Sequence, residues 1–384
     1  MKLLYILGNI INRAGVERIM TQKMNYLAES GIDVTLLTTD QNNHPISFPL
    51  SNHIRHASVK APIPSRSDFS FIKWLLLFYK SRNTFFKEVN NIAQEMRPDI
   101  IVCTTYSFDV LDLIEEICHR NKIKLVIESH IQQKNVFMKP RFSYNRILEL
   151  YGKAYDYFIL RHIRKADKLV CLTDEDKNAW ERLRIHNVHV IPNMITIQPP
   201  KLIDYSAKRV IAVGRYSHQK GFDMLIKVWG RLSSKYPDWH LYIFGNEDRS
   251  TYEEMAIKEN CQDSCHCMPV TEKIVSEYAK SSIFVMSSRY EGMPLALIEA
   301  MSSGLACVSF RCPNGPSDII QDGIDGYLAK NGDIDDLADK IENLICNEPL
   351  RKKMGEKARQ NIERYSPEAI MQQNKILYNT LISQ

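Results

Sequence analysis

Short apolar segments alternate with longer amphipathic ones along the whole chain. In the first half the apolar runs show little polar alternation, which is typical of strands buried on both faces of a parallel sheet. The segment 16–27 has instead the three- to four-residue spacing of a helix. The strands predicted for the first half are residues 3–7, 32–38, 100–104, 125–129, 168–172 and 188–192.

The second half repeats this alternation of strands and helices. Its predicted strands are residues 210–214, 241–245, 283–287, 306–310 and 327–328, and helices are expected to begin near Phe222, Glu272, Pro294 and Asp335. Strands that alternate with helices form βαβ units and a doubly wound sheet. The sequence therefore predicts an α/β protein of two Rossmann-like parallel-sheet domains.

A short polar segment with two adjacent prolines, Pro199 and Pro200, separates the halves and is interpreted as a linker at residues 196–207. We expect domains at 1–196 and 207–365. Residues 366–384 are predicted to form a helix, capped by Ser366 with Pro367 at its first position, that packs back on the first domain. Two such domains would face a cleft, with ligands bound beyond the carboxyl ends of the strands.

Length and composition limit the class of protein. The chain has 384 residues, which suits two domains, and no apolar run approaches the roughly 18–20 residues of a membrane span. The N-terminus begins like a signal peptide, but its apolar run is too short, so we interpret it as a first strand. Nine cysteines without a disulfide pattern favour the reducing cytoplasm.

The segment after predicted strand 283–287 carries the strongest chemical signal. Pro294 suits the start of a helix, and the free N–H groups of a helix start bind anions such as phosphate. Glu291 and Glu299 flank that start and could accept hydrogen bonds from sugar hydroxyls. The alternative is that Glu291 only complements the helix dipole and Glu299 lies on a solvated face. The candidate residues are Glu291, Gly292, Met293, Pro294, Leu295 and Glu299.

A second signal follows predicted strand 210–214. Arg215 and Lys220 lie five residues apart between Gly214 and Gly221. The arginine offers a fork of donors and the lysine a point charge, so the two can converge on a diphosphate. A solvated basic loop is the alternative reading of this motif alone.

Two further candidates follow strands of the first half. The loop after the first strand contains Ala14 and Gly15, which would let the backbone approach a ligand, although an ordinary turn would look the same. The loop does not match the dinucleotide fingerprint of dehydrogenases. His130 directly follows predicted strand 125–129, where it is either structural or faces the expected cleft.

Metal binding is not expected. Cys261, Cys265, His266 and Cys267 do not follow a common zinc spacing. The acidic residues from Asp333 fit a helix start better, and no strand ends in the paired aspartates that would hold a metal against a diphosphate. Arg215, Lys220 and the helix start would neutralise that charge instead. We expect no cofactor.

Together these motifs resemble the retaining glycosyltransferase family 4, of the GT-B fold, over nearly the whole chain. The matching elements are the E-x7-E pair of Glu291 and Glu299, the Gly-Arg and Lys-Gly steps at 214–215 and 220–221, the Ile-Pro-Asn at 191–193, and Gly323, Gly326 and Leu328. Ala14-Gly15 stands where members often carry Gly-Gly. The segment 312–320 resembles members that build bacterial surface polysaccharides and lipid-linked glycans.

The resemblance implies a role for each residue. Arg215 and Lys220 would hold the donor diphosphate, and Glu299 the ribose hydroxyls. Glu291 and the backbone of 292–295 would hold the sugar and distal phosphate, with His130 beside the sugar. A hexosyl or N-acetylhexosaminyl unit would move from a nucleotide-diphosphate sugar, by family frequency a UDP-sugar, with retained anomeric configuration.

The first half is expected to receive the acceptor, a glycan or a polyprenyl-diphosphate-linked saccharide. Its first 200 residues carry 27 Lys and Arg against 20 Asp and Glu. Basic and aromatic side chains are mixed in 70–89 and 139–168, which suits an anionic membrane surface, here the inner face of the plasma membrane. Amphipathic core helices with a solvated basic face explain the pattern equally well. No nucleic-acid-binding motif is present.

Two other functions remain open from the sequence alone. A nucleotide-sugar epimerase or hydrolase of the same fold would use the donor without an acceptor. An inactive nucleotide-sugar-binding scaffold would keep the binding residues without turnover. The donor sugar, the acceptor, the linkage and the oligomeric state are not fixed by these motifs, because small changes in hydroxyl contacts alter sugar selectivity.

Overall fold

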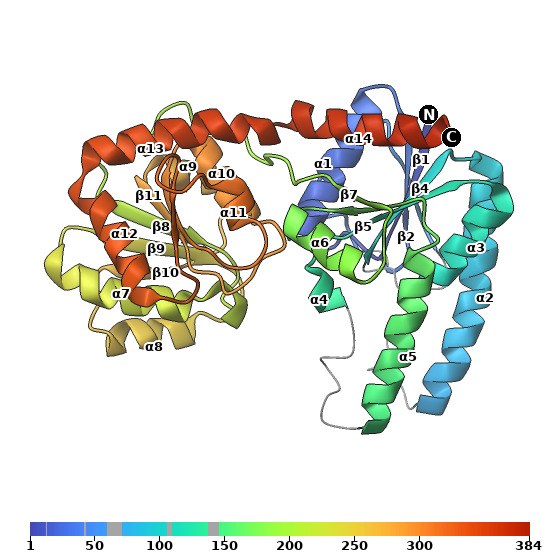
Figure 1. Cartoon of the computed structure of the whole chain (residues 1–384), viewed down its shortest axis with the longest axis horizontal. Coiled ribbons are helices and arrows are strands. Elements are labelled where there is room, and N and C mark those ends of the chain that lie inside the picture. Colours follow the sequence, from blue (N-terminus) through green and yellow to red (C-terminus); the bar gives the residue numbers. More distant parts are fainter. Residues whose placement is uncertain (13, 42–43, 60–70, 106–109, 137–145) are drawn as a thin grey trace. The chain divides into compact units, whose positions relative to one another are not determined.

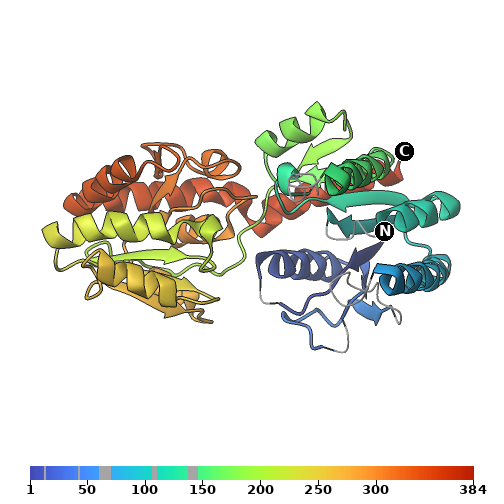
Figure 2. The same ribbon diagram turned by 90° about the horizontal axis from the view of Figure 1, so that it is seen from below.

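The computed structural model describes residues 1–12, 14–41, 44–59, 71–105, 110–136 and 146–384. The chain divides into two compact units, each built on a parallel sheet with helices on both faces (Figures 1 and 2). The first unit comprises Met1–Ile191 and Met371–Gln384, and the second Pro192–Ile370. The predicted doubly wound α/β architecture is confirmed.

The sheet of the first unit has, in the described residues, seven parallel strands in the order β3-β2-β1-β4-β5-β6-β7. The central strands β1 and β4 are buried along almost their whole length, as their continuous apolar runs predict. The strands are β1 (Lys2–Leu7), β2 (Asp33–Thr38), β3 (Arg55–Ser58), β4 (Ile100–Thr104), β5 (Lys124–Glu128), β6 (Lys168–Cys171) and β7 (Val188–Val190).

Helices cover the two faces of this sheet. α3 packs against both α2 and α5 on one face, while α1 lies with α4 and α6 on the other (Figure 1). The fully buried Phe85 and Trp180 anchor helices to the core. The helices are α1 (Gly15–Glu29), α2 (Phe71–Met96), α3 (Leu111–Asn121), α4 (Gln133–Val136), α5 (Arg146–Ile163) and α6 (Asp174–Arg182).

The second unit has the same topology on six parallel strands, in the order β10-β9-β8-β11-β12-β13. The strands are β8 (Arg209–Val213), β9 (His240–Gly245), β10 (Cys265–Pro269), β11 (Ile283–Met286), β12 (Ala306–Phe310) and β13 (Tyr327–Ala329). The helices are η4 (His218–Lys220), α7 (Phe222–Lys235), α8 (Ser250–Lys258), α9 (Ile274–Ala279), α10 (Leu295–Ser303), α11 (Pro316–Ile319), α12 (Ile334–Cys346), α13 (Glu348–Asn361) and η5 (Ile362–Tyr365).

Two strands, β3 and β10, are not predicted from the sequence, and both lie at sheet edges. β3 pairs with β2, is mostly exposed, and reads Arg-His-Ala-Ser, so it has no apolar run. β10 pairs with β9 and contains Cys265, His266 and Cys267 of the cysteine-rich segment. An edge strand needs less apolar surface than a central one, and its signal in the sequence is correspondingly weak.

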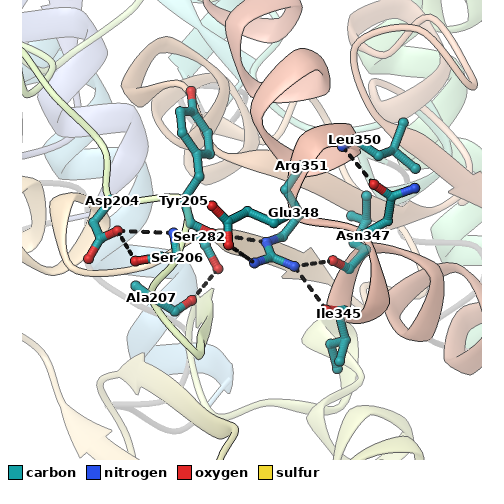
Figure 3. A network of polar contacts seen from close by, with 11 residues as sticks. Asp204, Tyr205, Ser206, Ala207, Ser282, Ile345, Asn347, Glu348, Leu350 and Arg351 are labelled. Carbon is teal, nitrogen blue, oxygen red and sulfur yellow. Dashed lines mark hydrogen bonds and ion pairs between the residues drawn. The ribbon is translucent and has the colours of Figure 1, made fainter.

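The segment expected to be a linker belongs to the second unit. The boundary between the units lies between Ile191 and Pro192, before the predicted 196–207. Figure 3 shows the contacts that hold its last residues: the Arg351 guanidinium donates to the carbonyl of Tyr205 and to the last carbonyls of α12, those of Leu344 and Ile345. The Tyr205 hydroxyl also donates to the carbonyl of Gly304 at 3.0 Å.

The last helix, α14 (Pro367–Ile382), begins in the second unit and ends in the first. In the first unit the Tyr378 hydroxyl lies 3.1 Å from the hydroxyl of Tyr5 on β1, and both side chains are fully buried. The Lys375 ammonium lies over the ring of Tyr26 on α1. None of the described helices combines the length and apolar content that crossing a membrane requires.

Candidate functional site

The topology of both sheets marks the places where ligands are expected. Strand order reverses between β1 and β4 in the first unit and between β8 and β11 in the second. In open α/β sheets, ligands bind beyond the carboxyl ends of the strands at this switch point. The loops that follow β8 and β11 carry most of the candidate residues, and the loops after β1 and β5 carry the others.

The structure joins the two second-unit loops through a lysine and a glutamate. The Lys220 ammonium lies 2.7 Å from Glu291 Oε1, and the Ser288 hydroxyl donates to the same oxygen at 2.6 Å. The side chain of Glu291 is 7% exposed and that of Lys220 17%. Two of the predicted residues therefore form a half-buried ion pair beyond the ends of neighbouring strands.

Two glycines make this approach possible. A Cβ on Gly214 would lie 3.0 Å from Cδ and Cε of Lys220, so the lysine stem crosses the position that a side chain would occupy. Gly221 has a φ of +64°, and a Cβ there would lie 2.1 Å from the carbonyl oxygen of Ser287. Gly221 is thus required by the packing of the two loops, whereas a side chain at Gly214 would displace the stem of Lys220.

The start of α10 is held from both sides. Pro294 is the N-cap, with extended backbone angles, and the helix begins at Leu295, one residue later than predicted. The Asn193 amide donates to the carbonyl of Met293 at 3.3 Å, and the N–H of Glu291 donates to the carbonyl of Pro313 at 3.2 Å. The first N–H groups of a helix have no intrahelical acceptors, so this segment can bind an anion.

Glu299 lies in the second turn of α10 and is buried, so the solvated-face alternative is wrong. Its carboxylate accepts a hydrogen bond from the hydroxyl of Thr196 and another from the hydroxyl of Tyr278 at 3.4 Å. A buried carboxylate that accepts hydroxyl donors has the chemistry required to bind the diol of a ribose.

Arg215 is placed differently from Lys220. Its side chain is 54% exposed, with the guanidinium 3.6 Å from Glu247 and 3.4 Å from the Gln219 side chain. The convergence of Arg215 and Lys220 on a diphosphate stays a prediction. An arginine that sequence reasoning missed, Arg289, stabilises the loop through a two-pronged pair with Asp223 at 2.7 and 2.8 Å.

In the first unit, Ala14 occupies the N-cap position of α1 without a side-chain hydrogen bond, and Gly15 is the first residue of that helix. The approach of this backbone to a ligand stays a prediction. Residue 13 of the preceding loop lies outside the described residues.

His130 belongs to a cluster of charged side chains in this unit. Its Nε2 lies 3.1 Å from Glu128 Oε2, while the Lys23 ammonium donates to Glu128 Oε1 at 2.6 Å. Burial by itself raises the pKa of Glu128, but the charge of Lys23 and the hydrogen bond of His130 outweigh it and lower that pKa to about 2.

Within the described ranges, no group of three or more His, Cys, Asp or Glu side chains is arranged to hold a metal. The cysteine-rich segment forms β10, where His266 stacks on His240 and Cys265 is buried. Asp333 caps α12 and accepts from the N–H groups of Asp335 and Asp336, which confirms the helix-start interpretation.

Sequence reasoning missed Ser288, Thr196, Lys23 and Glu128 as partners of the candidate residues. Ser288 lies three residues before Glu291, directly after predicted strand 283–287, and Glu128 lies two residues before His130 at the end of predicted strand 125–129. Both could have been suspected from spacing. Lys23 and Thr196 are 105 and 103 residues from their partners, and only the fold brings these side chains together.

Two family models match the chain. Residues 13–198 match the model described as Glycosyltransferase Family 4, and residues 194–361 match the model described as Glycosyl transferases group 1. An uncharacterized glycosyltransferase of Haemophilus influenzae is 29% identical, over 97% of this chain and 99% of its own. The amylovoran biosynthesis glycosyltransferase AmsD of Erwinia amylovora is 27% identical, over 98% and 99%.

A solved structure is similar over the same extent. A mutant of TarM from S. aureus, in complex with fondaparinux, alpha-GlcNAc-glycerol and UDP, superimposes with a TM-score of 0.75. The match covers 99% of this chain and 100% of that one, at 18% sequence identity. At this identity the similarity concerns the fold.

Proposed function

The chain belongs to glycosyltransferase family 4, and from this premise we propose that it transfers a hexosyl or N-acetylhexosaminyl unit from a UDP-sugar to a glycan or lipid-linked saccharide. Its fold is GT-B, as the sequence predicts. The name of AmsD, which refers to amylovoran biosynthesis, supports a role in a cell-surface polysaccharide. The UDP bound to the structurally similar TarM supports the choice of nucleotide.

The observation that carries the proposal is the Lys220–Glu291 pair beside the start of α10. A mobile anion can replace Glu291 as the partner of Lys220, because the lysine is long, flexible and partly exposed. The donor diphosphate is such an anion, and the N–H groups from Gly292 to Leu295 would bind its distal phosphate. Glu291 would then be released to accept hydrogen bonds from the sugar hydroxyls.

The same residues suit the chemical step. Breaking the bond between the sugar and the diphosphate leaves additional negative charge on the departing UDP. Lys220, Arg215 and the start of α10 would stabilise that charge in place. A phosphate oxygen of the leaving group would take the proton of the acceptor hydroxyl, with retention at the anomeric carbon. The proposal assigns no step to a metal, so turnover should be unchanged by excess EDTA.

Two buried side chains would select the donor. Glu299, which in this structure accepts from Thr196 and Tyr278, would bind the ribose hydroxyls. His130 would contact the sugar itself. A Glu299→Ala variant is therefore expected to bind UDP weakly, whereas His130→Ala should bind UDP normally and lose turnover of the UDP-sugar.

The acceptor side is proposed to face an anionic membrane through α2 and α5, which extend past the sheet in the same direction (Figure 1). Their exposed apolar side chains stand beside exposed lysines and arginines, a combination suited to a lipid headgroup region. Lys139, Arg141 and Tyr144 lie outside the described residues. The exposed apolar side chains are Leu76, Tyr79, Leu150, Tyr157 and Phe158, and the exposed basic ones include Lys73, Lys80, Lys153 and Arg161.

This surface can be tested with vesicles. The protein should sediment with phosphatidylglycerol vesicles at low salt and stay in the supernatant at high salt, because the attraction is electrostatic. Binding that ignores lipid charge would contradict this part of the proposal.

The central experiment is a thermal-shift screen of UDP-glucose, UDP-galactose and UDP-N-acetylglucosamine, followed by assays of UDP release with and without saccharide acceptors. A ligand that binds only the folded state raises the unfolding temperature by mass action. Acceptor-dependent UDP release supports transfer. Release without an acceptor indicates a hydrolase, and binding without any turnover indicates a scaffold.

A further inference from the structure

The first unit contains a buried cluster of a lysine, a glutamate and a histidine. The proposed transfer gives a role to the histidine, contact with the donor sugar, and none to the other two. Lys23 lies on α1, Glu128 ends β5, and His130 follows two residues later. Their side chains are 7%, 3% and 4% exposed. The glutamate bonds to Lys23 through Oε1 and to His130 through Oε2, so both its oxygens have a partner.

The protonation of this cluster follows from its contacts. Glu128 is ionised near neutral pH, since its pKa is lowered to about 2. An ionised carboxylate only accepts hydrogen bonds, so Nε2 of His130 must carry the proton that it shares with Glu128. In a neutral ring, Nδ1 is then the nitrogen with an available lone pair.

Three further titratable groups lie near Glu128 on other elements, and one of them, the Tyr378 hydroxyl, hydrogen-bonds to the same carboxylate. Burial raises the pKa of the Tyr5 and Tyr378 hydroxyls and of the Cys103 thiol, so all three stay neutral near pH 7. They come from β1, α14 and β4. Lys23 is therefore the cation, and Glu128 the anion, that fix the charge at this point.

We propose that Lys23 and Glu128 are positioning residues that hold His130 with its proton on Nε2, so that Nδ1 accepts a hydrogen bond from a hydroxyl group of the donor sugar. The inference rests on the proposed function, which places His130 beside that sugar. It adds a requirement on the substrate: the group that meets His130 is a hydrogen-bond donor, and a deoxy or methoxy sugar at that position is disfavoured.

Stability alone is a poor explanation for such a cluster. Replacing a buried ion pair by apolar side chains is often neutral or stabilising, because taking two charges out of water is costly. A pair that also orients a histidine has a functional reason to persist. In proteins generally, a carboxylate that accepts a hydrogen bond from one ring nitrogen of a histidine fixes the tautomer and leaves the other nitrogen free to bind a ligand.

The same unit contains a matched control with the opposite geometry. His162 on α5 bonds to Glu115 through Nδ1 at 2.8 Å, and Lys165 pairs with the same carboxylate at 3.0 Å. Lys165 is 47% exposed, while the side chains of His162 and Glu115 are 12% and 14% exposed. This second cluster combines the same three residue types and predicts the other tautomer, with the proton on Nδ1.

The first test reads the tautomers directly by ¹⁵N NMR of the full chain labelled at histidine, without any ligand. His130 should show the Nε2–H tautomer and His162 the Nδ1–H tautomer near pH 8, with signals assigned through His130→Gln and His162→Gln. The double variant Lys23→Met/Glu128→Leu, which leaves no buried charge alone, should change the pattern of His130 and leave that of His162 unchanged. An Nδ1–H tautomer for His130 in the unaltered protein overturns the inference.

The second test measures turnover of the UDP-sugar that is active in the donor screen. The double variant, and Glu128→Gln as a smaller change, should lower kcat/KM by roughly 10- to 100-fold, the range found when a partner that orients a metal-bound histidine is lost. The dissociation constant for UDP alone should stay within about twofold, because His130 faces the sugar. Glu115→Gln, the same change in the cluster of His162, should leave both values unaltered.

The outcomes distinguish a failure of the positioning role from a failure of the proposed function. If His130→Ala loses turnover while the double variant keeps it, the positioning role is wrong and the proposed function stands. If UDP binding falls together with turnover in the double variant, the pair is merely structural and the inference fails. If no UDP-sugar is turned over by the unaltered protein, the proposed function fails, whatever the tautomer of His130.

Discussion

Each unit contains a lysine–glutamate pair, one on the loops after β8 and β11 and the other between α1 and the last residue of β5, and the pairs differ in what the lysine can do. Lys220 and Glu291 lie 2.7 Å apart on loops after β8 and β11, with the lysine 17% exposed. Lys23 and Glu128 lie 2.6 Å apart, and the lysine is 7% exposed on a helix. The distances are nearly equal, so distance does not distinguish their roles.

The third partner and the supporting element make the difference. Glu291 also accepts a hydrogen bond from Ser288, and Lys220 reaches it from a loop and is partly exposed, so we propose that a ligand phosphate can replace the carboxylate in the first pair. Glu128 is shared with a histidine, and Lys23 is fixed within α1, so the second pair stays closed. An exchangeable pair suits substrate binding, whereas a closed pair suits positioning.

The largest expected effect comes from breaking the closed pair. Lys23→Met leaves Glu128 buried without a cation, and removing one partner of a buried pair destabilises a protein by about 3–5 kcal/mol. Hydrogen exchange of peptides from β1, α1 and β5, measured together with urea unfolding, should show the loss in the first unit. The double variant Lys23→Met/Glu128→Leu should recover most of it. A double variant as unstable as the single one would show that packing, and not charge, is responsible.

Breaking the exchangeable pair should impair turnover more than it impairs folding. Lys220→Ala is expected to lower kcat by roughly 10²–10³-fold, as when a donor that stabilises a developing charge is removed. UDP binding should also weaken, because the lysine is proposed to bind the diphosphate. Unfolding should change less than for Lys23→Met, since Glu291 keeps its bond from Ser288. Calorimetry with UDP and steady-state assays measure both effects.

The control for Lys220 is Lys235→Ala in the same unit. Lys235 also pairs with a glutamate, Glu342, but lies at the surface of α7. It should alter neither UDP binding nor turnover, because surface ion pairs contribute little. Equal effects of the two changes would contradict the assignment of Lys220.

Acidification should reduce the contribution of the closed pair to stability, because protonation of Glu128 removes its charge. The pKa of Glu128 lies near 2 in the folded protein and at its ordinary value of 4.5 when unfolded. Its ionised form therefore favours folding above pH 4.5, and this contribution is lost as the pH falls through 4.5 toward 2. The difference in unfolding free energy between the unaltered protein and Lys23→Met/Glu128→Leu, followed by urea titration from pH 6 to pH 2.5, should shift in favour of the variant on acidification. A constant difference would mean that the carboxyl is not held in its charged form.

The same comparison shows where sequence reasoning succeeds. The central strands and the motif around Glu291 are predicted because each is local: a run of apolar residues, or a helix start next to a strand. The closed pair joins residues 23 and 128, which belong to different βα units. Its presence depends on β1, β4 and β5 lying side by side, and no short window of sequence carries that information.

The contacts of residues 196–207 show the same limit of sequence reasoning. Adjacent prolines and polar residues predict a free segment, but Thr196 bonds to Glu299 and Tyr205 is held by Arg351, which is 146 residues away. Backbone carbonyls that meet a distant arginine leave no local signal. These contacts could not be predicted from the segment itself, for the same reason that Lys23 was missed.

The smallest expected effect tests whether Gly214 acts through the exchangeable pair. Gly214→Ala places a Cβ 3.0 Å from Cδ and Cε of Lys220, so the lysine stem must move by a few tenths of an ångström. We expect kcat/KM to fall by about 3- to 10-fold, less than the roughly 100-fold that a misplacement of 1 Å can cause. In a Lys220→Ala background the same change should have no further effect, because the side chain it displaces is gone. A double-mutant cycle in which the two losses add would instead place the role of Gly214 in the backbone of the loop.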